Sequence, residues 1–332
     1  MSGTVSAAWR GRVSPDAEAK PMNTPAIAVS GLQKTFGDKV VLAGIDLEVR
    51  AGTVFALLGP NGAGKTTTVN VLTTLMKADG GTVRVAGHDI ATEAKAVRKS
   101  IGVTGQFAAV DELLTGRENL QLMVDLNRSV TNKGIVTELL ERFELTESAD
   151  KPASTYSGGM RRKLDLAMTL VGSPRIIFLD EPTTGLDPRS RRTMWSIIRD
   201  LVADGVTIFL TTQYLEEADQ LADRIAVLDQ GRLVAQGTAD DLKRQIPGTH
   251  VRLRFTTAAE LDSAAQILTD GTRDDESLTL RVPSDGGTKS LRAVLARLDE
   301  YALSAEEFSV QTPDLDDVFL ALTGHNTEVV AK

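Results

Sequence analysis

The sequence predicts an α/β protein with a mixed, largely parallel core sheet, an antiparallel β subdomain, a helical subdomain and a small C-terminal α+β domain. Short continuous apolar runs at 53–58, 176–179 and 206–210 are separated by segments of helical periodicity, as expected for parallel strands that helices cover on both faces. Residues 26–49 instead alternate apolar and polar side chains, which is typical of antiparallel strands with one covered face. Apolar residues at helical spacing fill 115–145, and alternation returns after 247.

Composition limits the possible partners of the chain. Its 332 residues suit two domains, and 42% hydrophobic with 25% charged residues is the balance of a soluble globular protein. A net charge of -8 argues against nucleic-acid binding, and the lack of cysteine excludes disulfides and thiolate metal sites. No apolar run approaches the ~18 residues that span a bilayer. We therefore expect a cytoplasmic, water-soluble chain, in which any membrane role would depend on a partner or a peripheral contact.

Changes of composition predict the domain limits. Residues 1–25 are rich in Ala, Ser, Pro and charge, which predicts a disordered extension. The first domain should cover 26–246, with a helical subdomain at about 107–172. An accessory domain should follow at 247–324, and 325–332 should form a polar tail.

The segment Gly59–Thr67 predicts a phosphate-binding loop. It reads Gly-Pro-Asn-Gly-Ala-Gly-Lys-Thr-Thr and fits the G-x-x-x-x-G-K-[ST] pattern between a buried strand and a helix expected at 66–76. Backbone N–H groups and the helix dipole converge on one anion site there. Lys65 can reach the β- and γ-phosphates of a nucleotide, and the Thr66 hydroxyl can hold Mg²⁺. The whole loop is expected to contact the nucleotide, through Gly59, Pro60, Asn61, Gly62, Ala63, Gly64, Lys65, Thr66 and Thr67.

Two acids end the strand at 176–179. Carboxylates at the C-terminal end of a sheet strand lie where α/β proteins bind ligands. Next to a phosphate loop, Asp180 is placed to orient Mg²⁺ and Glu181 to polarise the attacking water. The alternative is that Asp180 and Glu181 are two acids in an ordinary turn before Pro182. The nearby phosphate loop favours the catalytic interpretation.

The segment Tyr156–Arg161, Tyr-Ser-Gly-Gly-Met-Arg, resembles the signature loop of ATP-binding cassette (ABC) transporter ATPases. The resemblance covers about 26–241 and implies a nucleotide-triphosphatase cassette that binds ATP. It also implies that Ser157, Gly158 and Gly159 contact the γ-phosphate held by a second subunit. A serine cap and two glycines at a helix N-terminus would form such an anion cradle.

Further positions match the family in order. Gln106 resembles the glutamine that contacts Mg²⁺ and water and faces the membrane partner. Phe36 resembles the aromatic residue that stacks on adenine, although a core or turn aromatic is the alternative. Asp187, in Gly185-Leu-Asp-Pro188, resembles the residue that communicates across the dimer.

One position departs from the family pattern. The loop after the strand at 206–210 normally carries a histidine, and here it carries Gln213. A glutamine amide can hydrogen-bond a γ-phosphate but cannot carry charge or pass a proton. This departure leaves Glu181 as the chief candidate base and Gln213 as an auxiliary catalytic residue.

Four segments narrow the resemblance to the daunorubicin-resistance type of ABC ATPase. They are Gly105–Glu112, Thr115–Asn119, Gln213–Gln220 and Leu315–Gly324. This type implies a peripheral subunit on the cytoplasmic face of the membrane, a separate ABC-2 type permease, an identical second ATP-binding subunit and export of a hydrophobic drug or secondary metabolite.

Alternatives remain at this point. The chain could be a soluble ABC ATPase acting on ribosomes or DNA, a non-hydrolysing regulatory module, or an exporter of another substrate such as a lipid or polysaccharide. The basic clusters Arg161–Lys163 and Arg189–Arg192 lie in an acidic chain. We expect them on solvated helix faces or against a partner subunit rather than on nucleic acid.

Overall fold

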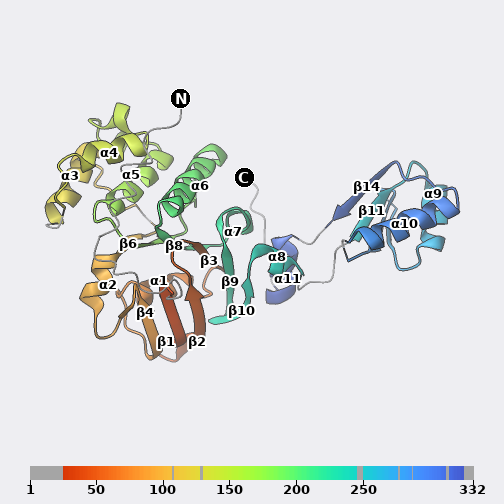
Figure 1. Ribbon diagram of the computed structural model, residues 1–332, viewed down its shortest axis with the longest axis horizontal. Coiled ribbons are helices and arrows are strands. Elements are labelled where there is room, and N and C mark those ends of the chain that lie inside the picture. Colours follow the sequence, from red (N-terminus) through yellow and green to blue (C-terminus); the bar gives the residue numbers. More distant parts are fainter. Residues whose placement is uncertain are drawn as a thin grey trace. The chain divides into compact units, whose positions relative to one another are not determined.

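The computed structural model describes residues 25–106, 108–127, 130–244, 250–275, 277–285, 287–311 and 314–324. The chain divides into two compact units between Ala239 and Asp240 (Figure 1). The limit that we expected at 246/247, the tail at 325–332 and all but the last residue of the extension expected at 1–25 lie outside the described residues. Each unit is described by itself.

The first unit is built on a six-stranded sheet in the order β10-β9-β3-β8-β7-β6. All neighbouring pairs are parallel except β9 with β10. The strands β3, β7 and β8 are buried along their whole length, as their continuous apolar sequences predict. The bounds are β3 Val54–Leu58, β6 Ile101–Thr104, β7 Ile176–Asp180, β8 Thr207–Thr212, β9 Arg224–Asp229 and β10 Arg232–Gly237.

Three phenylalanines on neighbouring strands stabilise the alignment of this sheet. Phe209 on β8 lies opposite Phe55 on β3 and Phe178 on β7. Their ring centroids are 5.4 and 5.5 Å apart, a spacing at which each aromatic pair contributes about 0.5–1.5 kcal/mol beyond area burial. Since the register is held in this way, the three strands end at the same edge of the sheet.

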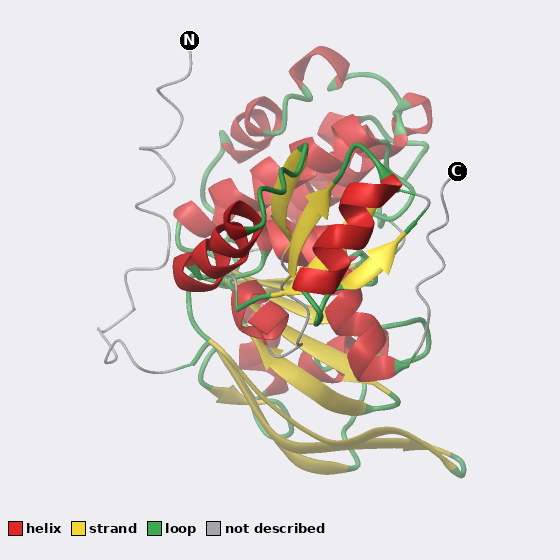
Figure 2. Cartoon of the chain, turned by 90° about the vertical axis from the view of Figure 1, so that its right-hand side faces the viewer, coloured by secondary structure: helices red, strands yellow, loops and turns green. Residues whose placement is uncertain are grey.

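An antiparallel sheet in the order β2-β1-β4-β5 forms the second layer, low in Figures 1 and 2. One hydrophobic core joins it to the six-stranded sheet through Val69, Val71 and Leu72 of α1 and Val97 of α2. The expected helix at 66–76 ends early at Leu72, and Thr74 has a left-handed φ of 65°. The bounds are β1 Ile27–Phe36, β2 Lys39–Val49, β4 Gly80–Val85, β5 His88–Asp89, α1 Lys65–Leu72 and α2 Ala94–Ser100.

The remaining helices of this unit begin at clear capping signals. Thr115 and Glu118 form a capping box at α3. Asp187 caps α6, whose first residue is Pro188, a favoured residue at the first helical position. The bounds are α3 Gly116–Leu126, α4 Ile135–Arg142, α5 Gly158–Leu170, α6 Pro188–Ala203 and α7 Leu215–Leu221, with short 3₁₀ turns at Thr146–Ser148 and Ala153–Thr155.

The second unit contains a β-α-β-β-α-β arrangement with the sheet order β12-β13-β11-β14, a ferredoxin-like topology. The helices α9 and α10 pack on one face over Val251, Leu253, Leu280 and Val282. The α+β interpretation did not anticipate β12, β14 or α11. The bounds are α8 Ala239–Arg244, β11 His250–Arg254, α9 Ala258–Ile267, β12 Thr272–Asp274, β13 Thr279–Pro283, α10 Thr288–Glu300, β14 Glu307–Gln311 and α11 Leu315–Thr323. Within the described ranges of either unit, no helix has the length and apolar character needed to cross a bilayer.

Candidate nucleotide-binding site

The carboxyl ends of four neighbouring parallel strands carry most of the predicted site residues. The loop Gly59–Gly64 follows β3, Gln213 follows β8, Asp180 and Glu181 lie at the end of β7, and Gln106 follows β6. Because the strands are parallel and in register, these segments meet at one edge of the sheet, where α/β folds bind ligands.

Two glycines give the phosphate loop its path. A Cβ on Gly59 would lie 2.3 Å from the backbone oxygen of Leu228 on β9, so no side chain fits there. Gly64 has a φ of 111° and a Cβ on it would lie 2.7 Å from Leu42, so this position needs glycine for conformation and for space. The loop therefore packs on β9 and β2 and delivers the N-terminus of α1 to the sheet edge.

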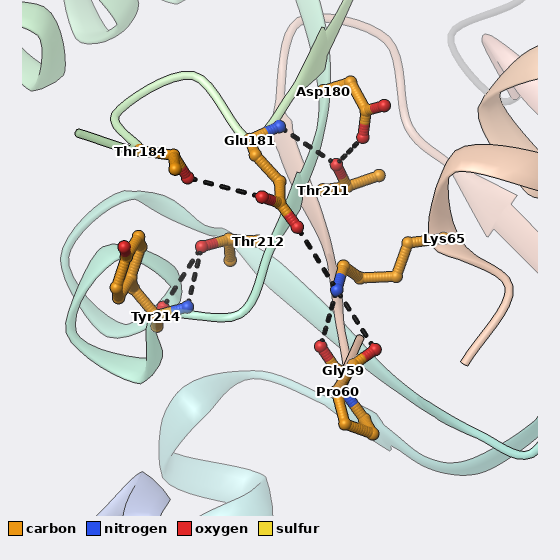
Figure 3. Close-up of polar contacts among 9 residues, drawn as sticks. All are labelled: Gly59, Pro60, Lys65, Asp180, Glu181, Thr184, Thr211, Thr212 and Tyr214. Atoms are coloured by element: carbon orange, nitrogen blue, oxygen red, sulfur yellow. Dashed lines mark hydrogen bonds and ion pairs between the residues drawn. The ribbon is translucent and has the colours of Figure 1, made fainter. Parts of the chain in front are cut away.

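Lys65 is the buried cation of the site, with only 5% of its surface exposed. Its Nζ donates hydrogen bonds to Gly59 O at 2.7 Å and to Pro60 O at 3.2 Å, and lies 3.4 Å from Glu181 Oε1 (Figure 3). Burial lowers the pKa of Lys65, and the charges of Glu181 and Asp180 oppose that shift. The ammonium group is therefore held where an anion at the loop meets a positioned positive charge.

Asp180 and Thr66 carry oxygen atoms of the hard kind that Mg²⁺ prefers. Asp180 is buried, and one carboxylate oxygen accepts a short hydrogen bond from the Thr211 hydroxyl. In the described part of the chain, no donor bonds its other oxygen, and the Thr66 side chain is exposed. The same part holds no group of three or more His, Cys, Asp or Glu side chains that could bind a metal. These residues fit a magnesium ion held by few protein ligands and by nucleotide phosphates.

Glu181 has a strained backbone, with a left-handed φ of 49°. A non-glycine residue in this region costs about 1–3 kcal/mol and persists only where its surroundings impose it. Its N–H donates to the backbone oxygen and the hydroxyl of Thr211, both at 3.1 Å. Its other carboxylate oxygen, Oε2, accepts from the Thr184 hydroxyl at 3.3 Å. In this conformation the carboxylate lies between Lys65 and Thr184 (Figure 3).

Arg162 on α5 is a further residue of the site that sequence reasoning missed. We expected the basic cluster at 161–163 on a solvated face or against a partner, and for Arg162 this was wrong, because only 7% of it is exposed. Its guanidinium donates to Asp180 O at 3.1 Å and to Pro182 O at 3.0 Å, the carbonyls on either side of Glu181. Arg161 and Lys163 do form more exposed ion pairs, with Glu112 and Glu144. Arg162, unlike its two neighbours, has no surface acid as its partner and instead holds the strained turn at Glu181.

The same arginine reaches the segment that carries Gln106. It donates to Gly105 O at 2.7 Å and forms an ion pair with Asp165 at 3.4 Å, while Asp165 accepts from the backbone N–H of Ala109 at 3.0 Å. The pair thus holds the chain on both sides of Gln106. Burial raises the pKa of Asp165, which the Ala109 N–H and the Arg162 charge partly offset. The sequence signal that could have revealed Arg162 is its i, i+3 spacing from Asp165 in a helix that is otherwise rich in apolar residues.

The signature segment begins α5. Ser157 Oγ accepts from Met160 N at 3.2 Å, so the serine caps the helix as expected. Ser157 and Gly158 are exposed, and a Cβ on Gly158 would meet nothing closer than Leu186 at 3.9 Å. A Cβ on Gly159 would lie 2.7 Å from the Ser190 hydroxyl of α6. The segment is therefore an open helix N-terminus whose free side faces solvent.

The other predicted residues lie around these two segments. The Asp187 carboxylate caps α6, accepting from the backbone N–H groups of Arg189 and Ser190 and from the Ser190 hydroxyl. Phe36 is 47% exposed and has Lys34 Nζ at 5.4 Å from its ring centre. Gln213 is half-buried, and in the described residues nothing hydrogen-bonds its amide. Phe36 thus offers an exposed ring, and Gln213 offers a free amide after β8.

Glu217 on α7 is a second residue that sequence reasoning missed. It is fully buried and accepts from Thr183 at 2.8 Å and from the Trp195 indole at 3.2 Å. Burial raises its pKa, opposed by these and other hydrogen bonds. It ties the turn after Glu181 to the segment after Gln213, and only the fold could reveal its burial.

The comparisons with known proteins agree with this geometry. Residues 42–184 match the family model described as ABC transporter. The chain is 48% identical to a daunorubicin resistance ATP-binding protein of Streptomyces coeruleorubidus, over 93% of this chain and 99% of that protein. It is 36% identical to the Nod factor export ATP-binding protein I of Ralstonia nicotianae, over 91% of this chain and 95% of the relative. A solved structure of an ATP binding subunit of an ABC transporter superimposes with a TM-score of 0.60 and 28% identity, covering 67% of this chain and 93% of that one.

Proposed function

Since this chain belongs to the ATP-binding subunits of ABC transporters, we propose that it energises the export of a hydrophobic drug or secondary metabolite. The transport would occur through a separate membrane-spanning permease of the ABC-2 type. The name of the 48% identical relative, a daunorubicin resistance protein matched over nearly its whole length, supports this substrate class. The chain itself would sit peripherally on the cytoplasmic face of the membrane.

Two copies would form two composite ATP sites, each between Gly59–Thr67 of one copy and Ser157–Gly159 of the other. The observation that carries this proposal is the contrast within one chain. Lys65 already has an acid partner and two carbonyl partners, whereas Ser157 and Gly158 are exposed at a helix N-terminus. A bound γ-phosphate would give that second cradle its anion and join the subunits.

The residues of this chain would divide the chemistry as follows. Lys65 would neutralise the β- and γ-phosphates, and its ion pair with Glu181 would give way to them. Glu181, held by its strained backbone, would accept a proton from the attacking water. Phe36 would stack on the adenine, and Gln213 and Gln106 would hydrogen-bond the γ-phosphate and the water. Loss of the γ-phosphate removes the bridging charge, so the two copies separate and move the permease.

Magnesium is the proposed second cofactor. Thr66 and Asp180 would hold it, with Gln106 near by, and when bound it supplies neutralisation of phosphate charge. Thr211 would keep the Asp180 carboxylate oriented through its hydroxyl.

The variant Glu181→Gln tests the catalytic assignment. It should bind ATP normally, lose most hydrolysis, and accumulate as an ATP-dependent dimer on size-exclusion chromatography. Glu144→Gln changes an exposed glutamate of the helical part and should behave as the wild type. Normal hydrolysis by Glu181→Gln would exclude Glu181 as the base.

The exported substrate needs a separate test, because a relative at 36% identity exports Nod factor and so favours a second substrate class. We would isolate native membranes, identify the membrane protein that co-purifies, and co-express the pair in a drug-sensitive host. Wild-type chain but not Lys65→Met should lower anthracycline accumulation. If accumulation is equal, the drug assignment is wrong, whereas a solely ribosomal partner would exclude export altogether.

A further inference from the structure

The two edges of the sheet in the second unit differ in how well they are protected. The β12 edge is three residues long, and its Arg273 is paired with Asp262 and Asp275. The β14 edge, Glu307–Gln311, is longer and contains neither proline nor lysine. Natural sheets protect exposed edges with short strands, charges or proline, because an open edge can pair with another strand. Only the β12 edge follows this rule fully.

The β14 strand also exposes apolar side chains on the core face of the sheet. Phe308 lies opposite Leu253, and Val310 lies opposite Val251. Leu253 and Val251 are fully buried under the helices, yet Phe308 is 54% exposed and Val310 39% exposed. The hydrophobic layer therefore continues past the helices to the open edge.

We infer that β14 pairs with β14 of a second copy of this chain, antiparallel and centred on Ser309. In this register Phe308 of each copy lies opposite Val310 of the other copy, which gives two such pairs. Aromatic–β-branched pairs stabilise antiparallel strands. Glu307 faces Gln311 of the other copy, so no acid lies opposite an acid. A register centred on Glu307 would place two carboxylates face to face, and one centred on Phe308 would place Glu306 opposite Val310.

The charges of the neighbouring strand favour the same arrangement. Arg254 on β11 already pairs with Glu307 at 3.2 Å and with Glu306 at 3.4 Å, which keeps both acids at one end of β14. At the other end Gln311 Oε1 accepts from the His250 ring Nε2–H at 2.8 Å, and Gln311 carries no charge. When two such strands pair antiparallel, the acidic end of each lies beside the neutral end of the other, so the two acidic ends stay apart. This contact joins two copies independently of nucleotide, and so goes beyond the composite ATP sites.

The lack of cysteine in the chain allows a register-specific test. In the full-length protein without ATP, Ser309→Cys should form a disulfide-linked dimer under mild oxidation, because its Cα atoms would lie about 4.5–5.5 Å apart. Gln311→Cys would put like residues about four strand positions, or about 13 Å, apart and should not cross-link. Thr272→Cys on the β12 edge controls for random collision.

We expect the cross-linked fraction of Ser309→Cys to exceed that of both controls at least tenfold, and Phe308→Lys in the same chain to reduce it to control level. Phe308 is exposed, so this change should not unfold the protein. Equal cross-linking at the three positions, or cross-linking that ignores Phe308→Lys, would overturn the pairing. ATP hydrolysis of the unoxidised Ser309→Cys protein reports separately on the composite ATP sites, so failure of one proposal is distinguishable from failure of the other.

Discussion

The two helix N-termini that the sequence predicted as anion sites differ in the state of their polar groups. At Gly59–Thr67 the loop is packed against neighbouring strands, and its buried lysine is bonded to two carbonyls and to Glu181. At Ser157–Gly159 the serine, among the residues that the structure describes, hydrogen-bonds through its side chain only inside its own helix, and the surface around Gly158 is open. Both present backbone donors at a helix N-terminus. The first segment holds its own charge balance, whereas the second has donors without a counter-charge, as half of a site completed by another subunit should.

The two segments are nevertheless connected within one chain. Arg162 lies on α5 shortly after Ser157 and bonds the carbonyls on either side of Glu181. A shift of the signature helix would therefore reach the strained turn of the candidate base. Because each segment of a chain serves a different composite site in the proposed dimer, Arg162 offers a physical path between the two sites.

The largest effect is expected from Lys65→Met, which removes the buried cation of the phosphate loop and so tests the difference between the two segments. Charged hydrogen bonds are worth about 1.5–3 kcal/mol each, so losing the lysine should weaken ATP binding about 100-fold. Titration with a fluorescent ATP analogue measures this. Lys163→Met, on the exposed pair with Glu144, is the matched control and should bind normally. Binding of Lys65→Met within threefold of the wild type would show that the loop does not depend on its lysine.

The opposite segment is tested by Gly158→Asp. There is room for the side chain, and an acid in the first turn favours the helix through its dipole, so the fold should tolerate it. The carboxylate would repel a γ-phosphate from the partner site, so hydrolysis should fall about 100-fold while nucleotide binding at the phosphate loop persists. Colorimetric phosphate release and the same fluorescent titration separate the two effects.

Mixing the Lys65→Met and Gly158→Asp proteins tests whether the two segments of different copies act in one site. In a dimer of Lys65→Met with Gly158→Asp, one composite site carries both changes and the other carries neither. Random pairing should restore about a quarter of wild-type hydrolysis, because half of the dimers are mixed and each has one intact site. A mixture that stays inactive would mean that each chain builds its site alone.

Sequence reasoning succeeded where a short motif coincides with a strand or helix end. The strand before Gly59, the strand that ends at Asp180, the helix start at Ser157 and the buried sheet follow from apolar runs and from residues that only certain turns accept. It failed where the role depends on tertiary burial. Arg162 and Lys163 look alike in the sequence, yet α5 directs the first into the interior and leaves the second paired with Glu144. Short strands such as β12, with three residues, carry too little pattern to be found.

Arg162 provides the next test, through stability as well as catalysis. Arg162→Met leaves Asp165 buried without its cation, which should cost about 3–5 kcal/mol of unfolding free energy. Chemical denaturation measures this loss. If enough protein folds, kcat should fall more than KM rises, since the residue positions Glu181 rather than binding ATP. Arg162→Lys should recover part of both, because an ammonium group can bond some of the same carbonyls.

The pH dependence of Arg162→Met separates a charge effect from a packing effect. The pKa of Asp165 is already raised by burial, and removing the guanidinium raises it further. A carboxyl whose folded pKa exceeds its unfolded value of about 3.9 loses stability as pH rises through the folded pKa. The stability deficit of Arg162→Met should therefore be smallest near pH 4 and grow toward pH 7. Adding Asp165→Asn should remove that growth, and a deficit independent of pH would assign the loss to packing alone.

The smallest expected effect belongs to Gln213, whose uncharged amide is proposed to hydrogen-bond the γ-phosphate. One lost neutral hydrogen bond is worth about 1 kcal/mol, so Gln213→Ala should slow hydrolysis about fivefold at saturating ATP. Gln220→Ala on the exposed part of α7 is the matched control. A glutamine cannot titrate, so Gln213→His should add an inflection near pH 6.5 to the rate profile that the wild type lacks. If Gln213→Ala hydrolyses ATP at the wild-type rate, the residue is a spectator and Glu181 with Lys65 accounts for the chemistry without help from the loop after β8.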